Sequence, residues 1–421
     1  MGSFFAELAR QASANARREV EAYAREIPEF GFLDTNSRAR AETLEYALWL
    51  RRRTVELSPD NSQLSDDDLC YIAAIGELRA AAGMSLDARQ RVLRLHTSLM
   101  LREINEATEA QRGVGVDELM RMMGWFAPQG ERGIRAYSQG FVTALRHRLP
   151  YVEQAALLAR SLLNGDPISA ELASALGMEL PERCVVTVIR VPDGPVGDGD
   201  LESEIEALVK THQAPIMWCP GKGSRSGELI ALIPLPPARP PASPGPSTAE
   251  TVRPHSVPDL VPDLLPDLVS DLVRDFAQAL GRPCAAGTAT SPLSEAADAL
   301  DLARRISRAA PLRRASARLR PHTVSDVFVE LAVADAPFVD EWLQTVSRSL
   351  QPGPDLLVTL DAYYRHDMHR GATAAALNVH PRTLDYRLRR VRELTGIDPG
   401  STRGVRILSS VVTRRLSEAW N

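Results

Sequence analysis

The chain has 421 residues and an apolar fraction of 44%, which suffices for several domains with their own cores and excludes a disordered protein. The net charge of -5 excludes a protein that is basic along its whole length, as a general nucleic-acid coat would be. Residues 351–421 nevertheless contain eleven arginines against seven acidic residues, a net charge of +4, which leaves -9 for residues 1–350. The C-terminal part is therefore expected to meet a polyanion.

The N-terminal residues MGSFFAELARQ lack the basic stretch and apolar core of a secretory signal. No apolar run reaches the roughly 18–20 residues of a membrane span, so we expect a soluble, cytoplasmic protein without membrane contact. The four cysteines are scattered and none has a CxxC spacing, so neither a zinc site nor a disulfide framework is indicated.

Residues 1–165 are expected to form a helical sensor-like or dimerisation domain. Apolar residues recur at helical spacing within 37–57, behind the cap-like pair Asn36 and Ser37, and again within 86–108. An apolar cluster follows that could line a ligand pocket or a dimer face, although ordinary core is the favoured interpretation. It comprises Met120, Met122, Met123, Trp125 and Phe126.

Residues 182–310 predict a small α/β domain. The β-branched run Cys184–Val191 is typical of a strand. Further strands are predicted at 214–219, 228–235 and 284–289, and helices at 201–210 and 293–309. A Pro-rich, low-complexity linker at 234–266 interrupts the domain, with nine prolines in 234–258 and a Pro-Asp-Leu repeat from Pro258 onward. This repeat is expected to lead into a helix at 267–280.

Two other kinds of site, a phosphate-binding loop and a metal site, can be assessed from residue spacing. The glycine-rich segment 221–227 could cradle a phosphate, but it lacks P-loop spacing and joins two predicted strands, which favours a hairpin turn. His366 and His369 could share a helical face and bind a metal, but no third ligand is apparent. No catalytic grouping of Ser, Cys, His and Asp is recognisable, so we expect no enzyme activity, no cofactor and no metal.

The region 322–421 is predicted to be helical, with a helix-turn-helix at about 355–421. Helix one is expected at 355–365, helix two at 373–378 and a turn at 378–380. Helix three begins at Pro381, which suits a first helical turn, and runs to residue 394 before Gly396.

Helix three has two contrasting faces when its residues are placed 100° apart. Leu384, Leu388 and Val391 form an apolar seam. The opposite face carries Arg382, Tyr386, Arg389 and Arg390. Such a helix can anchor on one side and enter the major groove of DNA on the other. The alternative is a basic helix that only faces solvent.

Seven residues are the candidate DNA-binding residues. Residues near the start of helix three reach bases in such motifs, which favours Arg382, Thr383 and Tyr386 for base reading, while Arg389 and Arg390 hold the backbone. Arg387 lies at the edge of the apolar seam, where a structural or phosphate-binding role is favoured. Thr373, in helix two, completes the set. His380, in the turn, either contacts phosphate or packs against the turn, and packing is favoured.

The spacing resembles the C-terminal helix-turn-helix of the PucR/CdaR family of bacterial regulators. That family shows a small-residue helix like Thr373–Ala375, then Val379-His380, Thr383, Tyr386-Arg387-Leu388 and Leu394-Thr395-Gly396. The family often has Asn before the Thr, where this chain has Arg382 preceded by Pro381, a departure that bears on operator sequence. Residues 182–310 resemble the GGDEF-like middle domain of these regulators, without a GGDEF sequence. The N-terminal part resembles helical sensor-like domains of some such regulators and of stressosome-type proteins.

The resemblance implies a multidomain, mainly α protein that binds double-stranded DNA through the helix at 381–394 and regulates transcription. Because one helix-turn-helix contacts few base pairs, a homo-oligomer is expected. A small-molecule effector or a partner would control it. The alternative is a signalling or stress-response scaffold that does not bind DNA and docks protein partners on its N-terminal bundle.

Overall fold

The computed structural model describes residues 4–110, 116–192, 201–221, 226–235, 267–315 and 319–420. Most of the predicted linker, residues 236–266, and the tip of the glycine-rich turn lie outside the described residues. The chain divides into two compact units, residues 1–150 with 166–177 and residues 151–165 with 178–421. Helix 151–163 thus belongs to the second unit, although the predicted N-terminal domain, residues 1–165, includes it. The protein is multidomain and mainly helical, as expected, with one small sheet.

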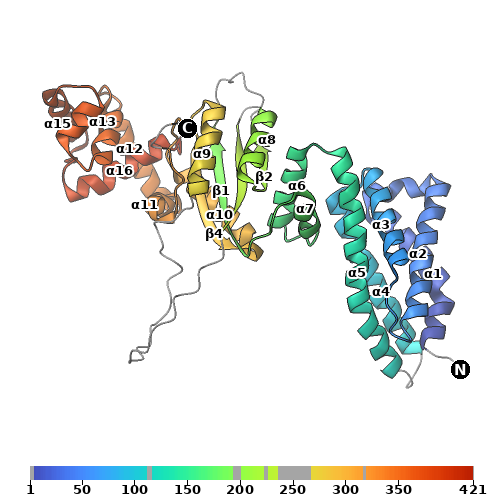
Figure 1. Cartoon of the computed structure of the whole chain (residues 1–421). Helices are drawn as coiled ribbons and strands as arrows, with labels where there is room; N and C mark the ends of the chain where they lie inside the picture. Colours follow the sequence, from blue (N-terminus) through green and yellow to red (C-terminus); the bar gives the residue numbers. More distant parts are fainter. Residues whose placement is uncertain are drawn as a thin grey trace, which may run out of the picture. The chain divides into compact units, whose positions relative to one another are not determined.

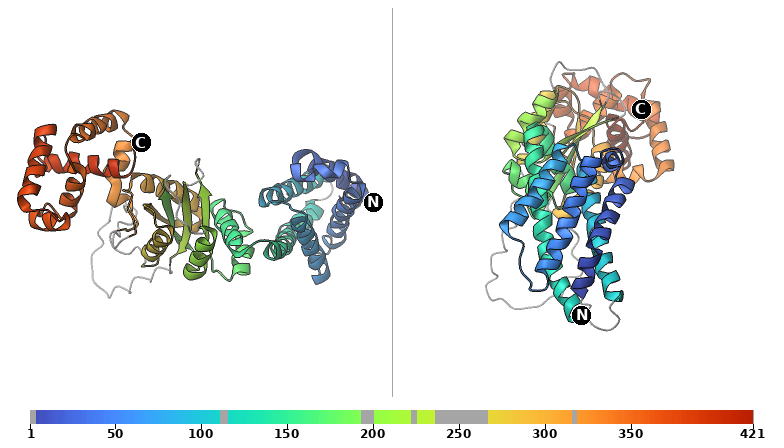
Figure 2. Two further views of the ribbon diagram at one scale, coloured as in Figure 1. Left: turned by 90° about the horizontal axis from the view of Figure 1, so that it is seen from above. Right: turned by 90° about the vertical axis from the view of Figure 1, so that its right-hand side faces the viewer.

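The first unit is a bundle of helices that run alongside one another (Figures 1 and 2). Its elements are α1 (Phe4–Glu26), the 3-10 helix η1 (Pro28–Asp34), α2 (Ser37–Leu57), α3 (Asp66–Ala81), α4 (Leu86–Ala110), α5 (Val116–Arg148) and α7 (Ser169–Leu176). Helix α3 packs on α5, and α1 packs on α2 and α4. The predicted start of α2 is confirmed, because the Asn36 side chain accepts a hydrogen bond from the Ala39 amide at 3.0 Å.

The apolar cluster at the start of α5 is only partly core. Met122 and Trp125 are buried, and Met122 packs with Phe4 and Ile104. Met120 and Met123 are exposed, so the prediction that they belong to the core is wrong. Helical periodicity explains the split, because residues 122 and 125 share the buried face of α5 while residues 120 and 123 lie away from it.

The crossing of α3 and α5 depends on two glycines that face each other's helix. A Cβ atom on Gly76 would lie 2.1 Å from the carbonyl oxygen of Tyr137, and one on Gly140 would lie 1.9 Å from that of Ala73. Real Cβ atoms do not approach backbone oxygens so closely, so only glycine permits this separation of the two helices.

The second unit is built around an antiparallel sheet of order β2-β3-β1-β4 among its described residues. Its strands are β1 (Arg183–Val191), β2 (Ile216–Pro220), β3 (Gly227–Pro234) and β4 (Ala285–Pro292). The helices around it are α6 (Tyr151–Leu163), α8 (Leu201–His212), α9 (Asp267–Leu280) and, after the short η2 (Leu293–Glu295), α10 (Ala296–Ala309). Every strand and helix predicted for this domain is confirmed, with ends shifted by a few residues.

The two faces of the sheet are covered by different helices. Phe276 of α9 contacts Trp218 of β2 on one face. On the other face α10 lies so close to β4 that a Cβ on Gly287 would be 2.3 Å from the Ala303 carbonyl oxygen. Strands β2 and β3 pair antiparallel up to Gly221, whose amide donates to the Ser226 carbonyl at 2.8 Å. The strands on either side of this segment are therefore antiparallel neighbours, as the predicted hairpin requires.

The C-terminal part of the second unit is helical (Figure 1). Its helices are α11 (Val324–Ala334), α12 (Pro337–Leu350), α13 (Leu356–Arg365), α14 (Arg370–Ala376), α15 (Pro381–Thr395) and α16 (Thr402–Leu416). Backbone hydrogen bonds connect it to the sheet, since the Leu312 amide donates to the Leu416 carbonyl at 2.9 Å and Arg313 exchanges two bonds with Cys284. None of the helices in the described ranges is long and apolar enough to span a membrane.

Replacing Gly140 with alanine should force α3 and α5 apart and lower the local free energy of unfolding by about 1–3 kcal/mol. The same replacement at Gly130, also in α5 but with no atom within 4 Å of its Cβ position, should raise it by up to about 1 kcal/mol. Hydrogen exchange of the α3 and α5 amides in the full chain measures both effects. Equal protection in the two variants would contradict the close crossing.

Candidate nucleic-acid interface

The inner face of α15 is anchored in the core of the C-terminal helices. Leu384, Leu388 and Val391 are buried there, together with residues of α13 and α16 such as Leu360 and Leu408. This is the seam expected from the spacing of helix three. Burial of three aliphatic side chains along one line fixes the rotation of α15 about its own axis, and therefore fixes which residues point outward.

The turn between α14 and α15 is tight. Asn378 adopts the left-handed conformation with φ of 53°, and the Val379 amide donates to the Ala374 carbonyl at 3.0 Å. Asparagine tolerates this conformation better than most residues. At the other end, Gly396 has φ of 70° and its amide donates to the Arg392 carbonyl at 2.8 Å. The predicted turn and the predicted glycine stop are both confirmed.

Histidines cap both helices of the motif. The Nδ1 atom of His369 accepts a hydrogen bond from the Ala372 amide at 3.0 Å, and that of His380 accepts one from the Arg382 amide at 3.2 Å. Helix α14 therefore begins at Arg370, three residues before the predicted start. His380 is exposed and acts as a cap, in place of the packing role favoured from sequence.

The outer face of α15 carries the residues predicted to read bases. Arg382, Thr383 and Arg389 are exposed, and Tyr386 is 60% exposed. Within the described residues, the side chains of Arg382, Tyr386 and Arg389 form no hydrogen bond or ion pair. Their donors are therefore available to a ligand approaching from solvent.

Two other arginines of α15 are already engaged. Arg387 donates to the carboxylate of Asp355 at 2.8 Å and to the Thr359 hydroxyl at 3.3 Å, which ties α15 to the start of α13. Of the two roles expected for Arg387, structural or phosphate-binding, this geometry fits the structural one. Arg390 is paired with Glu393 at 2.9 Å, one turn along the same helix. An exposed pair of this kind holds its arginine weakly, so Arg390 can exchange partners.

Thr373 does not lie at this surface. Its side chain is 0% exposed, and its hydroxyl donates to the His369 carbonyl at 2.8 Å. A side chain in this position cannot reach DNA while α14 remains folded, so we withdraw Thr373 from the candidate residues. Helix two is predicted to begin at Thr373, but in the structure Thr373 lies one turn inside α14 and faces the core.

Helix α16 is absent from the sequence-based prediction of three helices. Ser401 caps it by accepting from the Gly404 amide at 3.0 Å, and Leu408 and Val411 bury its inner face. Exposed arginines, Arg403 and Arg406, lie in its first turns. The Ser401 cap followed by apolar residues at helical spacing is the signal that could have revealed it.

One further group supports the frame of the motif. The Tyr364 hydroxyl donates to the Pro399 carbonyl at 3.3 Å, which links α13 to the loop before α16. Burial raises the pKa of Tyr364 well above its ordinary value, so this phenol remains a donor at neutral pH.

Neither His366 nor His369 belongs to a metal-binding group. Among the described residues, no three or more His, Cys, Asp or Glu side chains lie together in a way that could hold a metal ion. All four cysteines are free, and burial raises the pKa of Cys184 and of Cys284, so these thiols are protonated at neutral pH.

Comparison with known families agrees with this architecture. Residues 356–409 match the family model of the PucR C-terminal helix-turn-helix domain, and residues 164–309 match that of a GGDEF-like domain. The C-terminal helices are thus similar to the helix-turn-helix domain of PucR-type regulators. Residues 13–160 match the N-terminal domain of the RsbT co-antagonist protein rsbRD, in agreement with the stressosome-type resemblance of the bundle.

Individual relatives match this chain over short stretches. The carbohydrate diacid regulator of Escherichia coli is 51% identical over 43 residues, which are 10% of this chain and 11% of that protein. An uncharacterized protein of Mycobacterium tuberculosis is 36% identical over 96 residues, or 22% of this chain and 23% of its own length. The chain thus covers less than a quarter of either relative.

One solved structure aligns with about two thirds of this chain. The regulator of polyketide synthase expression from Bifidobacterium adolescentis covers 66% of this chain and 98% of its own, with 17% identity and a TM-score of 0.26. No conclusion rests on a likeness of this degree.

Replacing Asn378 with valine should destabilise the turn by about 1–2 kcal/mol, because a β-branched side chain resists positive φ. Replacing it with glycine should leave the turn about as stable as before, since glycine adopts positive φ freely. Hydrogen exchange of the α14 and α15 amides in the full chain reports the difference. Valine and glycine variants with the same protection would show that the turn conformation is not required.

Proposed function

We propose that the chain is a transcription regulator that reads double-stranded operator DNA with α15. The observation that carries this proposal is the outer face of α15, where Arg382, Tyr386 and Arg389 are exposed and unpaired on a helix whose rotation is fixed by its buried seam. Arginine can pair bidentately with guanine in the major groove and also neutralises phosphates. The match to the PucR helix-turn-helix domain supports the same function.

The roles divide along the helix. Arg382, Thr383 and Tyr386 lie in the first turns of α15, where side chains of a recognition helix meet base edges. Arg389 lies about two turns further along and is proposed to contact phosphate, together with Arg390 once it leaves Glu393. Arg387 instead holds the helix in place through Asp355.

Two copies of the chain are proposed to bind one operator. A single α15 covers only a few base pairs, and paired helices reach half-sites that lie about 34–36 Å apart along DNA. A small-molecule effector or a partner protein is proposed to control binding. Saturation of an isolated operator by one chain, measured by mass photometry of the complex, would contradict the proposed pairing.

The double substitution Arg382→Ala and Tyr386→Ala should abolish sequence-specific retardation of DNA taken from the chain's own promoter region. Each lost base contact should weaken specific binding about tenfold to a hundredfold. The single substitution Arg389→Ala should instead weaken binding to all sequences alike and reduce the salt slope of the association constant by about 1.

Arg348→Ala serves as a charge-matched control, because Arg348 is an exposed arginine of α12 whose side chain bonds only to Thr345 among the described residues. It should leave sequence preference unchanged. Wild-type specificity in the double variant would remove α15 from the interface. Absence of any specific binding by the native chain would favour the alternative function, a scaffold that docks protein partners on residues 13–160, the part matched to the rsbRD N-terminal domain.

A further inference from the structure

A cavity of about 350 Å³ lies inside the second unit, where the sheet meets the C-terminal helices. One wall is the segment that follows α10 and runs along β4, because Arg313 pairs with Cys284 and the His322 amide donates to the Ala286 carbonyl at 2.9 Å. The other wall is formed by α13 and α16, and α11 closes one side. Its volume is at the lower end of the range for small-molecule sites, roughly 300–1,000 Å³.

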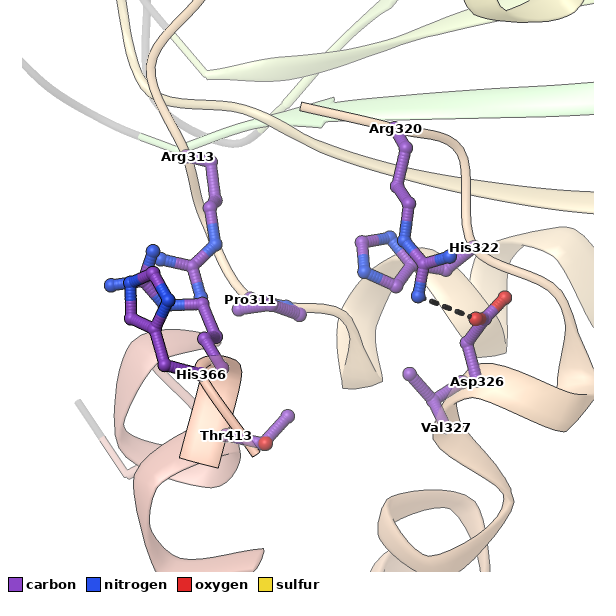
Figure 3. A pocket seen from close by; sticks show the side chains of 9 residues that line it. Pro311, Arg313, Arg320, His322, Asp326, Val327, His366 and Thr413 are labelled. Carbon is purple, nitrogen blue, oxygen red and sulfur yellow. Dashed lines mark hydrogen bonds and ion pairs between the residues drawn. The ribbon is translucent and has the colours of Figure 1, made fainter. Parts of the chain in front are cut away.

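The lining of the cavity is predominantly basic. Figure 3 shows Arg313 and His366 on one side and Arg320 and His322 on the other, with a gap between them. Arg365 is a fifth nitrogen-bearing side chain in the lining. The remaining residues of the lining are Pro311, Asp326, Val327 and Thr413.

The acidic residues near the cavity do not balance its arginines. Asp361 alone serves two guanidinium groups, since Arg313 donates to it at 2.9 Å and Arg365 at 2.6 Å. One carboxylate between two guanidinium groups leaves one positive charge uncompensated. This excess does not depend on the histidines, and burial in fact lowers the pKa of His322, which keeps that ring uncharged at neutral pH.

Asp326 is the one carboxylate in the lining, and both of its oxygens already accept hydrogen bonds. As the N3 residue of the capping box of α11, it accepts from the Thr323 amide at 2.8 Å and from the Thr323 hydroxyl at 2.9 Å. Arg320 donates to its other oxygen at 2.8 Å. The positive end of the α11 dipole offsets this carboxylate further, so it opposes an incoming anion weakly.

Unused hydrogen-bonding capacity points to a ligand. The Nε2 atom of His366 is buried and has no hydrogen-bond partner among the described residues, although the side chain lines the cavity. Arg320 is 67% exposed and, among the described residues, makes its side-chain bond only to Asp326, so its guanidinium group has donors left for a ligand. A buried polar atom without a partner is costly, and a bound acceptor would remove that cost.

We propose that this cavity binds a small organic anion through a carboxylate or phosphate group. Arg313 and His366 on one side and Arg320 on the other would donate to its oxygens, and charge-assisted bonds of this type are the strongest that arginine makes. Binding of this anion does not depend on whether the chain binds DNA.

The anion site also lies where a ligand could affect DNA binding by α15. Asp361, Arg365 and His366 lie at the end of α13, the helix that packs against α15, and Arg313 comes from the segment anchored to β4. A bound anion would therefore connect the sheet to the frame of the helix-turn-helix. This second step rests on the proposed function, and its effect on DNA affinity should be about five- to a hundredfold.

The binding test uses the full chain, in calorimetric titrations with succinate and, separately, with inorganic phosphate, at matched ionic strength set by sodium chloride. We expect one saturable site for at least one of these anions. The Arg320→Gln and His366→Gln double variant should bind it at least about tenfold more weakly. Tighter binding of succinate would assign a carboxylate ligand, and tighter binding of phosphate would assign a phosphate ester.

Arg274→Gln is the matched control, because Arg274 on α9 also pairs with an aspartate at 2.8 Å and is 46% exposed, but lies outside the cavity lining. It should bind the anion as the native chain does. The single variant Arg320→Gln, at an exposed side chain, serves if the double variant does not fold. Native affinity in the double variant or in Arg320→Gln would contradict the proposed site. So would the absence of binding of either anion by the native chain up to about 10 mM.

A second measurement tests separately whether the bound anion changes the affinity of the chain for DNA. Retardation of promoter DNA is compared with and without the anion, in the native chain and in Arg320→Gln. A change in DNA affinity that Arg320→Gln abolishes supports control through the cavity. An unchanged DNA affinity overturns control alone, and lost DNA binding by Arg320→Gln without any anion would place the cavity in the DNA interface and overturn the effector site.

Discussion

Burial of one apolar face of α15 determines most of what the C-terminal domain can do. With Leu384, Leu388 and Val391 held in the core, the helix cannot rotate, and its opposite face must point to solvent. The ion pair of Arg387 with Asp355 reinforces the same rotation from the edge of the seam. A recognition surface needs this rigidity, because base-edge hydrogen bonds tolerate only small errors in position.

The helices that anchor α15 also line the basic cavity. Helices α13 and α16 carry the anchor of α15, and they also contribute His366 and Thr413 to the basic cavity beside the sheet. Direct bonds join the two parts of this unit, since Arg190 of β1 donates to the Ser417 carbonyl at 3.1 Å just after α16. A ligand that changes how α13 and α16 lie against the sheet would therefore act on the frame that positions α15. No pathway longer than one helix is needed for such coupling.

Local patterns made much of this fold predictable. The β-branched run of β1, the Asn36 cap of α2 and the phase of α15 each depend on residues within a few positions, and the structure confirms all three. Features that depend on distant segments were not predictable. Thr373 is buried because α14 begins one turn earlier on an unusual histidine cap. Arg79 lies 5.4–5.9 Å from four aromatic ring centroids, and nothing in its neighbourhood in sequence separates it from an exposed arginine.

Net charge was a weak guide to function because it does not show which arginines are paired with carboxylates in the fold. Of the eleven arginines in residues 351–421, six lie within ion-pair distance of a carboxylate, and these are Arg365, Arg370, Arg387, Arg390, Arg392 and Arg414. The outer face of α15 and the cavity differ from the rest of this surface because their guanidinium groups outnumber the nearby carboxylates. Counting charges along the chain cannot find such places, since ion pairs form between residues far apart in sequence. Only the folded arrangement identifies which arginines remain available to an anion, whether the phosphates of DNA or a small ligand.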